Sequence, residues 1–125
     1  MNEQVRRALA RDRNIDITTI GRVTGQPRRI EIWFHNLDGT VYITGSPGKR
    51  DWYANLIAHP DFTFHLKSGV TADLPARATP ITDPAERRLL FERILRNIGN
   101  LAELEAWLTG SPLVRVAFSD AQSPA

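Results

Sequence analysis

The sequence contains no cysteine, and this absence excludes disulfide scaffolds, thiolate metal sites and thiol nucleophiles together. It also lacks long apolar runs. No stretch approaches the length of a membrane-spanning helix, and residues 1–13 have no apolar signal-peptide core. The net charge is only +2, and the local excess of basic residues between positions 22 and 50 is too small for the broad basic face that nucleic-acid binding usually needs. We therefore expect a cytoplasmic protein with no stable membrane insertion and no nucleic-acid partner.

Signals for a metal site and for a serine hydrolase site are also missing. The histidines His35, His59 and His65 are scattered, and no His-x-x-x-His pair or carboxylate cluster accompanies them. His35 and His65 fall on the polar side of their alternating strand patterns, which predicts surface or barrel-rim positions. Ser46 is followed directly by proline, so there is no Gly-x-Ser-x-Gly nucleophile elbow. We expect no bound metal.

The composition that remains is that of an ordinary globular protein. Of the 125 residues, 42% are hydrophobic and 24% are charged, which is typical of a folded domain rather than a disordered chain. The length predicts one domain over residues 1–125. Within it we expect an N-terminal helix over 1–13 and a flexible tail over 119–125.

Hairpin signals dominate the order of the predicted elements. Strands are expected at 15–20, 29–37, 40–44, 62–66, 70–81 and 113–118. Helices are expected at 52–58, 84–97 and 101–108, with Asp51 and Asp83 as the N-caps of the first two. So many hairpins do not suit a parallel sheet. The order predicts a mainly β (α+β) fold, a closed or half-closed antiparallel barrel with peripheral helices.

Two glycine-containing turns, Gly21–Arg29 and Gly45–Arg50, each follow a predicted strand and are flanked by basic residues. Between positions 22 and 50 the bases are Arg22, Arg28, Arg29, Lys49 and Arg50, against the acids Glu31 and Asp38. This local excess suits an anionic small molecule, and the second turn leads into a predicted helix N-terminus, which favours anions. In a barrel the two turns could lie side by side and form one basic rim. Two ordinary turns with solvated arginines would give the same pattern.

Two motifs resemble those of a known family. Residues 18–28 read Thr-Thr-Ile-Gly-Arg-Val-Thr-Gly-Gln-Pro-Arg and resemble the Thr-Thr-Gly-Arg-Lys-Thr/Ser-Gly-x-x-Arg signature of deazaflavin-dependent nitroreductases. Residues 52–60 resemble the same family's Trp-Tyr-x-Asn-Leu-x-Ala-x-Pro block, in the same order and at a similar spacing. On these motifs the chain is identified as a member of the flavin/deazaflavin oxidoreductases. This resemblance implies a split β-barrel of about six mostly antiparallel strands with peripheral helices.

The resemblance also implies binding of coenzyme F420, a 5-deazaflavin that carries a phosphate and an oligoglutamate tail. The predicted cofactor-binding residues lie in the first turn and the strand after it, in the second turn, and at the start of the following helix. They are Arg22, Val23, Thr24, Arg28, Arg29, Ile30, Glu31, Thr44, Gly45, Ser46, Pro47, Gly48, Lys49, Arg50, Asp51, Trp52, Tyr53 and Asn55. Arg22, Arg28 and Arg29 suit phosphate and carboxylate groups. Trp52 suits either a wall for the ring or a place in the core.

The implied activity is hydride transfer from the reduced deazaflavin to a small organic acceptor such as a quinone, a nitroaromatic or an activated enone. Ser46 is the candidate catalytic residue, through a hydrogen bond near the ring or the acceptor. Val23 stands where family members usually have lysine, which leaves FMN as an alternative cofactor. Leu101 and Leu104 stand where a nitroreductase of the family has tyrosines, so a more apolar acceptor pocket is expected. A non-catalytic deazaflavin carrier is the alternative from another class, and either a monomer or a homodimer is expected.

Overall fold

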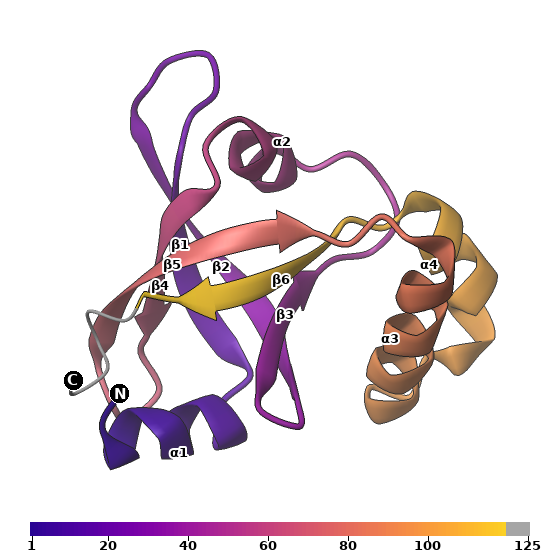
Figure 1. The fold of residues 1–125 in the computed structure, drawn as a ribbon, viewed down its shortest axis with the longest axis horizontal. Helices are drawn as coiled ribbons and strands as arrows, with labels where there is room; N and C mark the ends of the chain where they lie inside the picture. Colours follow the sequence, from indigo (N-terminus) through magenta and orange to yellow (C-terminus); the bar gives the residue numbers. More distant parts are fainter. Residues whose placement is uncertain (120–125) are drawn as a thin grey trace.

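The computed structural model describes residues 1–119, so all of the expected tail except Ser119 lies outside the described residues. The strands pair antiparallel and close into a barrel in the order β1-β2-β3-β6-β5-β4, with the helices around it (Figure 1). The strands are β1 (Asn14–Ile20), β2 (Pro27–Leu37), β3 (Thr40–Thr44), β4 (Asp61–Leu66), β5 (Ala72–Pro80) and β6 (Leu113–Phe118). The helices are α1 (Glu3–Arg11), α2 (Asp51–Ala58), α3 (Pro84–Asn97), the 3₁₀ turn η1 (Leu101–Glu103) and α4 (Leu104–Gly110). This confirms the expected mixed α+β barrel.

The helix starts are set by local hydrogen bonds in two cases and not in the third. Asn2 caps α1 by accepting a hydrogen bond from the Val5 N–H at 2.8 Å. Asp83 caps α3 by accepting from the Glu86 N–H at 2.9 Å, as expected. The expectation that Asp51 caps α2 is wrong. Arg50 occupies the N-cap position without a side-chain hydrogen bond, and Asp51 is the first helical residue.

The core is divided between the inside of the barrel and one outer wall. Inside, Ile15, Ile17, Phe34 and Phe64 are essentially inaccessible, and the two phenylalanine rings meet edge to face with centroids 5.2 Å apart. Burial of each such side chain contributes about 1.5–3 kcal/mol to the free energy of unfolding. The barrel therefore has a packed interior, and a ligand has to bind at its mouth or outside it.

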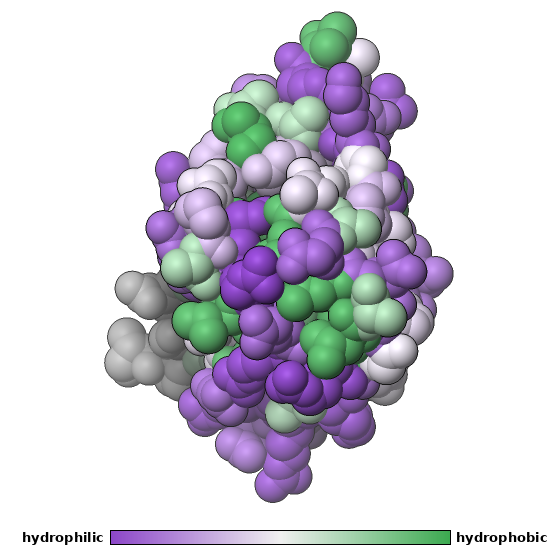
Figure 2. All heavy atoms as spheres, turned by 90° about the vertical axis from the view of Figure 1, so that its right-hand side faces the viewer, coloured by the Kyte–Doolittle hydropathy of each residue, from purple (hydrophilic) through white to green (hydrophobic). Residues whose placement is uncertain are grey.

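A second cluster lies between the barrel wall and the α3–α4 pair. Phe91 and Trp107 meet there edge to face with ring centroids 6.0 Å apart, and Leu113 of β6 is fully buried against the same cluster. Leu104 packs at its edge, whereas Leu101 and Leu89 are exposed. Apolar side chains accordingly interrupt the charged surface on this side of the molecule (Figure 2).

The expected surface positions of His35 and His65 are wrong, because both side chains are buried. His65 lies between two partners, with Nε2 2.7 Å from the Thr18 hydroxyl and Nδ1 2.7 Å from the Asp73 carboxylate. His35 faces a small cavity of about 120 Å³ that Ala10 of α1 and Asn97 of α3 also line. The polar sides of both strands are therefore covered by other elements, which strand alternation alone does not show.

No helix within residues 1–119 is long and apolar enough to span a bilayer. Over the same range, no three His, Cys, Asp or Glu side chains gather into a group that could hold a metal ion.

Candidate functional site

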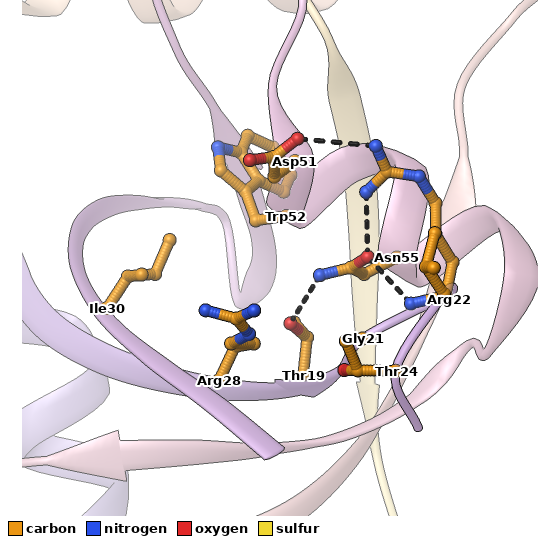
Figure 3. Close-up of a pocket in the computed structure, with 10 residues that line it drawn as sticks. Thr19, Gly21, Arg22, Thr24, Arg28, Ile30, Asp51, Trp52 and Asn55 are labelled. Carbon is orange, nitrogen blue, oxygen red and sulfur yellow. Dashed lines mark hydrogen bonds and ion pairs between the residues drawn. The ribbon is translucent and has the colours of Figure 1, made fainter. Parts of the chain in front are cut away.

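A pocket of about 300 Å³ opens between the β1–β2 hairpin and α2 (Figure 3). The hairpin extends beyond the rest of the barrel (Figure 1). Its lining comes from the hairpin, from the turn between its strands and from the first two turns of α2. The lining residues are Thr19, Gly21, Arg22, Val23, Thr24, Arg28, Ile30, Asp51, Trp52 and Asn55. The pocket thus combines the two segments that carry the family motifs.

Strand alternation decides which residues of β2 reach this pocket. In the β1–β2 ladder Arg28 is paired with Thr19 and Ile30 with Ile17. Because paired residues share a face, Arg28 and Ile30 continue the inner face of the barrel and both line the pocket. Figure 3 shows their side chains pointing toward Trp52.

Arg29 and Glu31, which were also predicted to bind the cofactor, lie on the opposite face of the same strand. Arg29 Nε is 3.0 Å from an Asp16 carboxylate oxygen, and Lys67 bridges Asp16 and Glu31. Hydrogen bonds from Lys67 lower the pKa of both carboxyls, and the same contacts raise the pKa of Lys67 itself. The cluster of Asp16, Arg29, Glu31 and Lys67 joins the strands on the outer wall, away from the pocket.

The turn that closes the pocket leaves little room for a side chain at its base, Gly21. A Cβ atom at Gly21 would lie 2.7 Å from the Thr24 hydroxyl, closer than real contacts allow. Gly21 and Gln26 are also joined through their backbones, N–H to carbonyl, at 2.8 Å. Val23 at the tip of this turn is 88% exposed, and the tip is the outermost part of the hairpin (Figure 1).

Asn55 ties α2 to the turn. Its side chain is only 4% exposed. Its Oδ1 accepts hydrogen bonds from the Arg22 backbone N–H at 3.0 Å and from Arg22 Nη1 at 2.9 Å. Its Nδ2 donates to the Thr19 hydroxyl at 3.3 Å. Since its polar atoms are used within the protein, Asn55 positions Arg22 in the pocket wall.

The cations of the pocket differ in their partners. Arg22 also pairs with Asp51, Nη2 to Oδ1 at 3.3 Å. The Arg28 side chain has no hydrogen bond or ion pair with any residue in the described range 1–119. A guanidinium that faces a pocket without a partner is suited to a carboxylate or phosphate, because its planar donors match two oxygens at once.

Trp52 belongs to the core and also lines the pocket. It is buried in the barrel core cluster and meets the Tyr53 ring edge to face at 6.0 Å. It also lines the pocket opposite Ile30. Together these side chains provide an apolar wall next to the unpaired Arg28, which is an arrangement suited to a ring that carries an anionic group.

The second predicted turn, Gly45–Arg50, is held by contacts outside the pocket. The Thr44 hydroxyl donates to the Pro112 carbonyl, the Gly48 N–H to the Gly110 carbonyl at 3.0 Å, and Arg50 Nη2 to the Ser46 carbonyl at 2.8 Å. None of residues 44–50 lines the pocket, and the two turns lie on either side of α2 (Figure 1). The structure thus does not bring them together into one rim. Ser46 is exposed on this second turn.

Sequence reasoning did not single out Arg87, which fixes the end of α4 beneath the second turn. Its guanidinium donates to the carbonyls of Ile81 at 3.0 Å, Leu108 at 3.1 Å and Ser111 at 2.8 Å. Burial lowers the pKa of this guanidinium, and Tyr53 opposes the shift. Nothing in the helical pattern of α3 separates Arg87 from the neighbouring arginines, so no sequence signal marks it.

The sequence model of the F420H(2)-dependent quinone reductase family matches residues 2–117 of this chain. The chain belongs to this family. The description of the family makes it one of F420-dependent oxidoreductases, in agreement with the resemblance seen in the motifs.

Solved structures support the fold of this quinone reductase family member. An F420 reductase superposes with a TM-score of 0.74 at 18% identity, over 95% of this chain and 96% of that chain. A conserved hypothetical protein from Mycobacterium tuberculosis gives 0.67 at 20% identity, over 94% and 81%. A FAD-binding protein from Mesorhizobium loti gives 0.67 at 15% identity, over 95% and 91%. At these identities the similarities establish the split-barrel fold alone.

Proposed function

We propose that this protein is an F420-dependent reductase that transfers hydride from the reduced deazaflavin to a small organic acceptor such as a quinone, a nitroaromatic or an activated enone. The observation that carries the proposal is the unpaired Arg28 in a pocket built from both family motifs. Family membership supports the same cofactor. Which member of this class of acceptors is the natural one would be set by the fine specificity of the site.

The residues of the pocket fit such a cofactor. Arg28 supplies a free cation for a phosphate or tail carboxylate. Ile30 and Trp52 supply an apolar wall for a ring. Asn55 holds Arg22 and the turn in place through its hydrogen bonds to the Arg22 N–H and Nη1. The pocket volume of about 300 Å³ suits part of a deazaflavin, so the remainder would extend over the neighbouring surface.

When bound, the reduced deazaflavin supplies the hydride, and the protein's own contribution is to orient it and exclude water. Trp52 and Ile30 would fix the plane of the ring, and Arg28 would fix its anionic end. Ser46, the predicted catalytic residue, belongs to the second turn, does not line the pocket and is exposed. It would act on a ring or acceptor that reaches past the N-terminus of α2.

The test is a titration of the purified protein with F420 and with FMN, followed by fluorescence. The proposal predicts micromolar or tighter binding of F420 and weaker binding of FMN, followed by turnover with quinones or nitro compounds. Binding of neither cofactor would refute it. Preferential binding of FMN would favour the FMN alternative, and F420 binding without turnover across an acceptor panel would favour a carrier.

The role of Arg28 is tested with Arg28→Ala, using F420 and a deazaflavin that lacks the phosphate and tail. The substitution should weaken binding of the long-tailed form about tenfold or more, because a charge-assisted contact is lost. Added salt should reduce the difference between variant and wild type. Arg96→Ala is the matched control, since Arg96 is also an exposed arginine without a described partner, but lies on α3. Equal loss for the tail-less form would contradict the assignment.

A further inference from the structure

The two arginines of the pocket differ in whether a protein carboxylate already lies beside them. Arg28 has no partner within residues 1–119, whereas Arg22 already has a carboxylate beside it, that of Asp51. Asp51 itself lines the pocket, and Figure 3 shows its carboxylate above the cavity, next to the Arg22 guanidinium. A carboxylate in this position repels any anion that approaches Arg22.

The contact between Asp51 and Arg22 is weak enough to be exchanged. It consists of one N–O approach of 3.3 Å, and the Asp51 side chain is 91% exposed. Ion pairs of this kind contribute little because water screens them. Arg22, by contrast, is anchored independently through Asn55, which accepts from its N–H at 3.0 Å and from Nη1 at 2.9 Å. If Asp51 turns away, Arg22 therefore remains in the pocket wall with Nη2 free.

Helix capping does not explain this carboxylate. An aspartate that caps a helix accepts from a backbone N–H of the first turn. In α2 the N-cap position belongs to Arg50, and no side-chain capping bond is present there. The hydrogen-bond partner that the structure gives Asp51 among residues 1–119 is the Arg22 guanidinium.

We propose that Asp51 is a specificity-determining residue that acts as an internal competitor for Arg22. It occupies the second cation of the pocket until a ligand with more than one negative charge displaces it, while monoanions and neutral molecules find Arg28 alone. This inference rests on the proposed function, because it takes this pocket as the site that binds the anionic part of the deazaflavin. It assigns Asp51 a role opposite to that of a direct cofactor contact.

The experiment compares wild type, Asp51→Asn and Asp51→Glu in fluorescence titrations with F420 and with the tail-less deazaflavin. Removal of a unit charge close to an exposed anion site should tighten F420 binding about threefold to tenfold at low salt. High salt should diminish that gain. The tail-less form should change by less than about twofold, because it lacks the charges that Asp51 repels. Asp51→Glu should behave as wild type.

Asp61→Asn is the matched control, because Asp61 is a similarly exposed carboxylate paired with Arg77 at 3.0 Å and lies outside this pocket. Asp61→Asn should leave the affinities for F420 and for the tail-less deazaflavin unchanged. If it tightened F420 binding as much as Asp51→Asn, the effect would come from the net charge of the protein, and the proposal would be overturned. Unchanged F420 binding in Asp51→Asn would also overturn it. Weaker binding of both deazaflavins would do the same, by showing that Asp51 holds the ligand.

Calorimetric titration with inorganic pyrophosphate separates this inference from the proposed function. If the wild type binds no deazaflavin, the proposed function fails and the pyrophosphate comparison decides the role of Asp51. Tighter pyrophosphate binding by Asp51→Asn than by wild type supports the internal competitor. Equal binding, or no binding to either protein, overturns it.

Discussion

Burial of His35 predicts a specific loss of stability in mild acid. The side chain is 8% exposed, and burial, with a smaller effect from the Arg13 charge, lowers its pKa from the ordinary 6.5 to about 4. In the folded protein the ring is therefore neutral at pH 5, whereas in the unfolded chain it takes up a proton below 6.5. The contribution to stability is fully present above pH 6.5 and is lost as the pH falls toward 4.

The magnitude follows from the size of the shift. Each pH unit between the two pKa values costs about 1.4 kcal/mol, so a decrease from pH 6.5 to 5 removes about 2 kcal/mol from the free energy of unfolding. The carboxyls with lowered pKa, such as Asp16 and Glu31, have ordinary values of 3.8 and 4.5. Their own losses begin below this window, so these two carboxyls contribute little to the change between pH 7.5 and 5.

Urea unfolding at several pH values between 5 and 7.5 measures this effect. Wild type should lose about 2 kcal/mol over the range, and His35→Gln should lose much less, because its side chain does not titrate. His59→Gln is the control, since His59 is exposed, and it should keep the wild-type slope. If His35→Gln retains the full pH dependence, the buried neutral histidine is not its source and the reasoning fails.

Two further predictions concern the hairpin that carries the pocket. Asn55→Ala removes the acceptor of the Arg22 N–H and Nη1, so it should lower the free energy of unfolding by about 1–3 kcal/mol and weaken F420 binding. Asn55→Asp keeps the acceptor and should recover part of both in the same unfolding and fluorescence measurements. Lys67→Met removes the bridge on the outer wall and should lower the thermal midpoint without changing F420 affinity. A loss of affinity in Lys67→Met would show that the outer wall takes part in binding.

The elements that could be predicted from the sequence are those fixed by neighbouring residues. The Asp38-Gly39 turn has both residues at positive φ, 55° and 93°, which is the requirement that the dipeptide meets best in a tight hairpin. Asp83 and Pro84 likewise start α3 through a single local bond to the Glu86 N–H. Each of these signals is complete within a few residues, so it needs no knowledge of the rest of the fold.

Positions decided by distant elements could not be predicted in this way. Whether the first and second turns share a rim depends on α2, which lies between them (Figure 1). The second turn is instead held by Gly110, at the end of α4. By contrast, the alternation of faces within residues 28–31 follows from the sequence alone once a strand is assigned there. It places Arg28 and Ile30 at the pocket, and Arg29 and Glu31 on the outer wall.

The attraction of the pocket for an anion depends on which of its cations are free of a partner. The chain as a whole carries +2, and the pocket lining holds Arg22 and Arg28 against Asp51, a local balance of +1. A lysine in place of Val23 would add a charge at a tip that is 88% exposed, where solvent screens it. Arg28 lies in the pocket lining with Ile30 and Trp52 and has no partner within residues 1–119, so its guanidinium is free to pair with an anionic ligand. If the proposed function holds, the departure from the family pattern at Val23 removes only a peripheral contact, and the central contact would depend on Arg28 and on whether Asp51 releases Arg22.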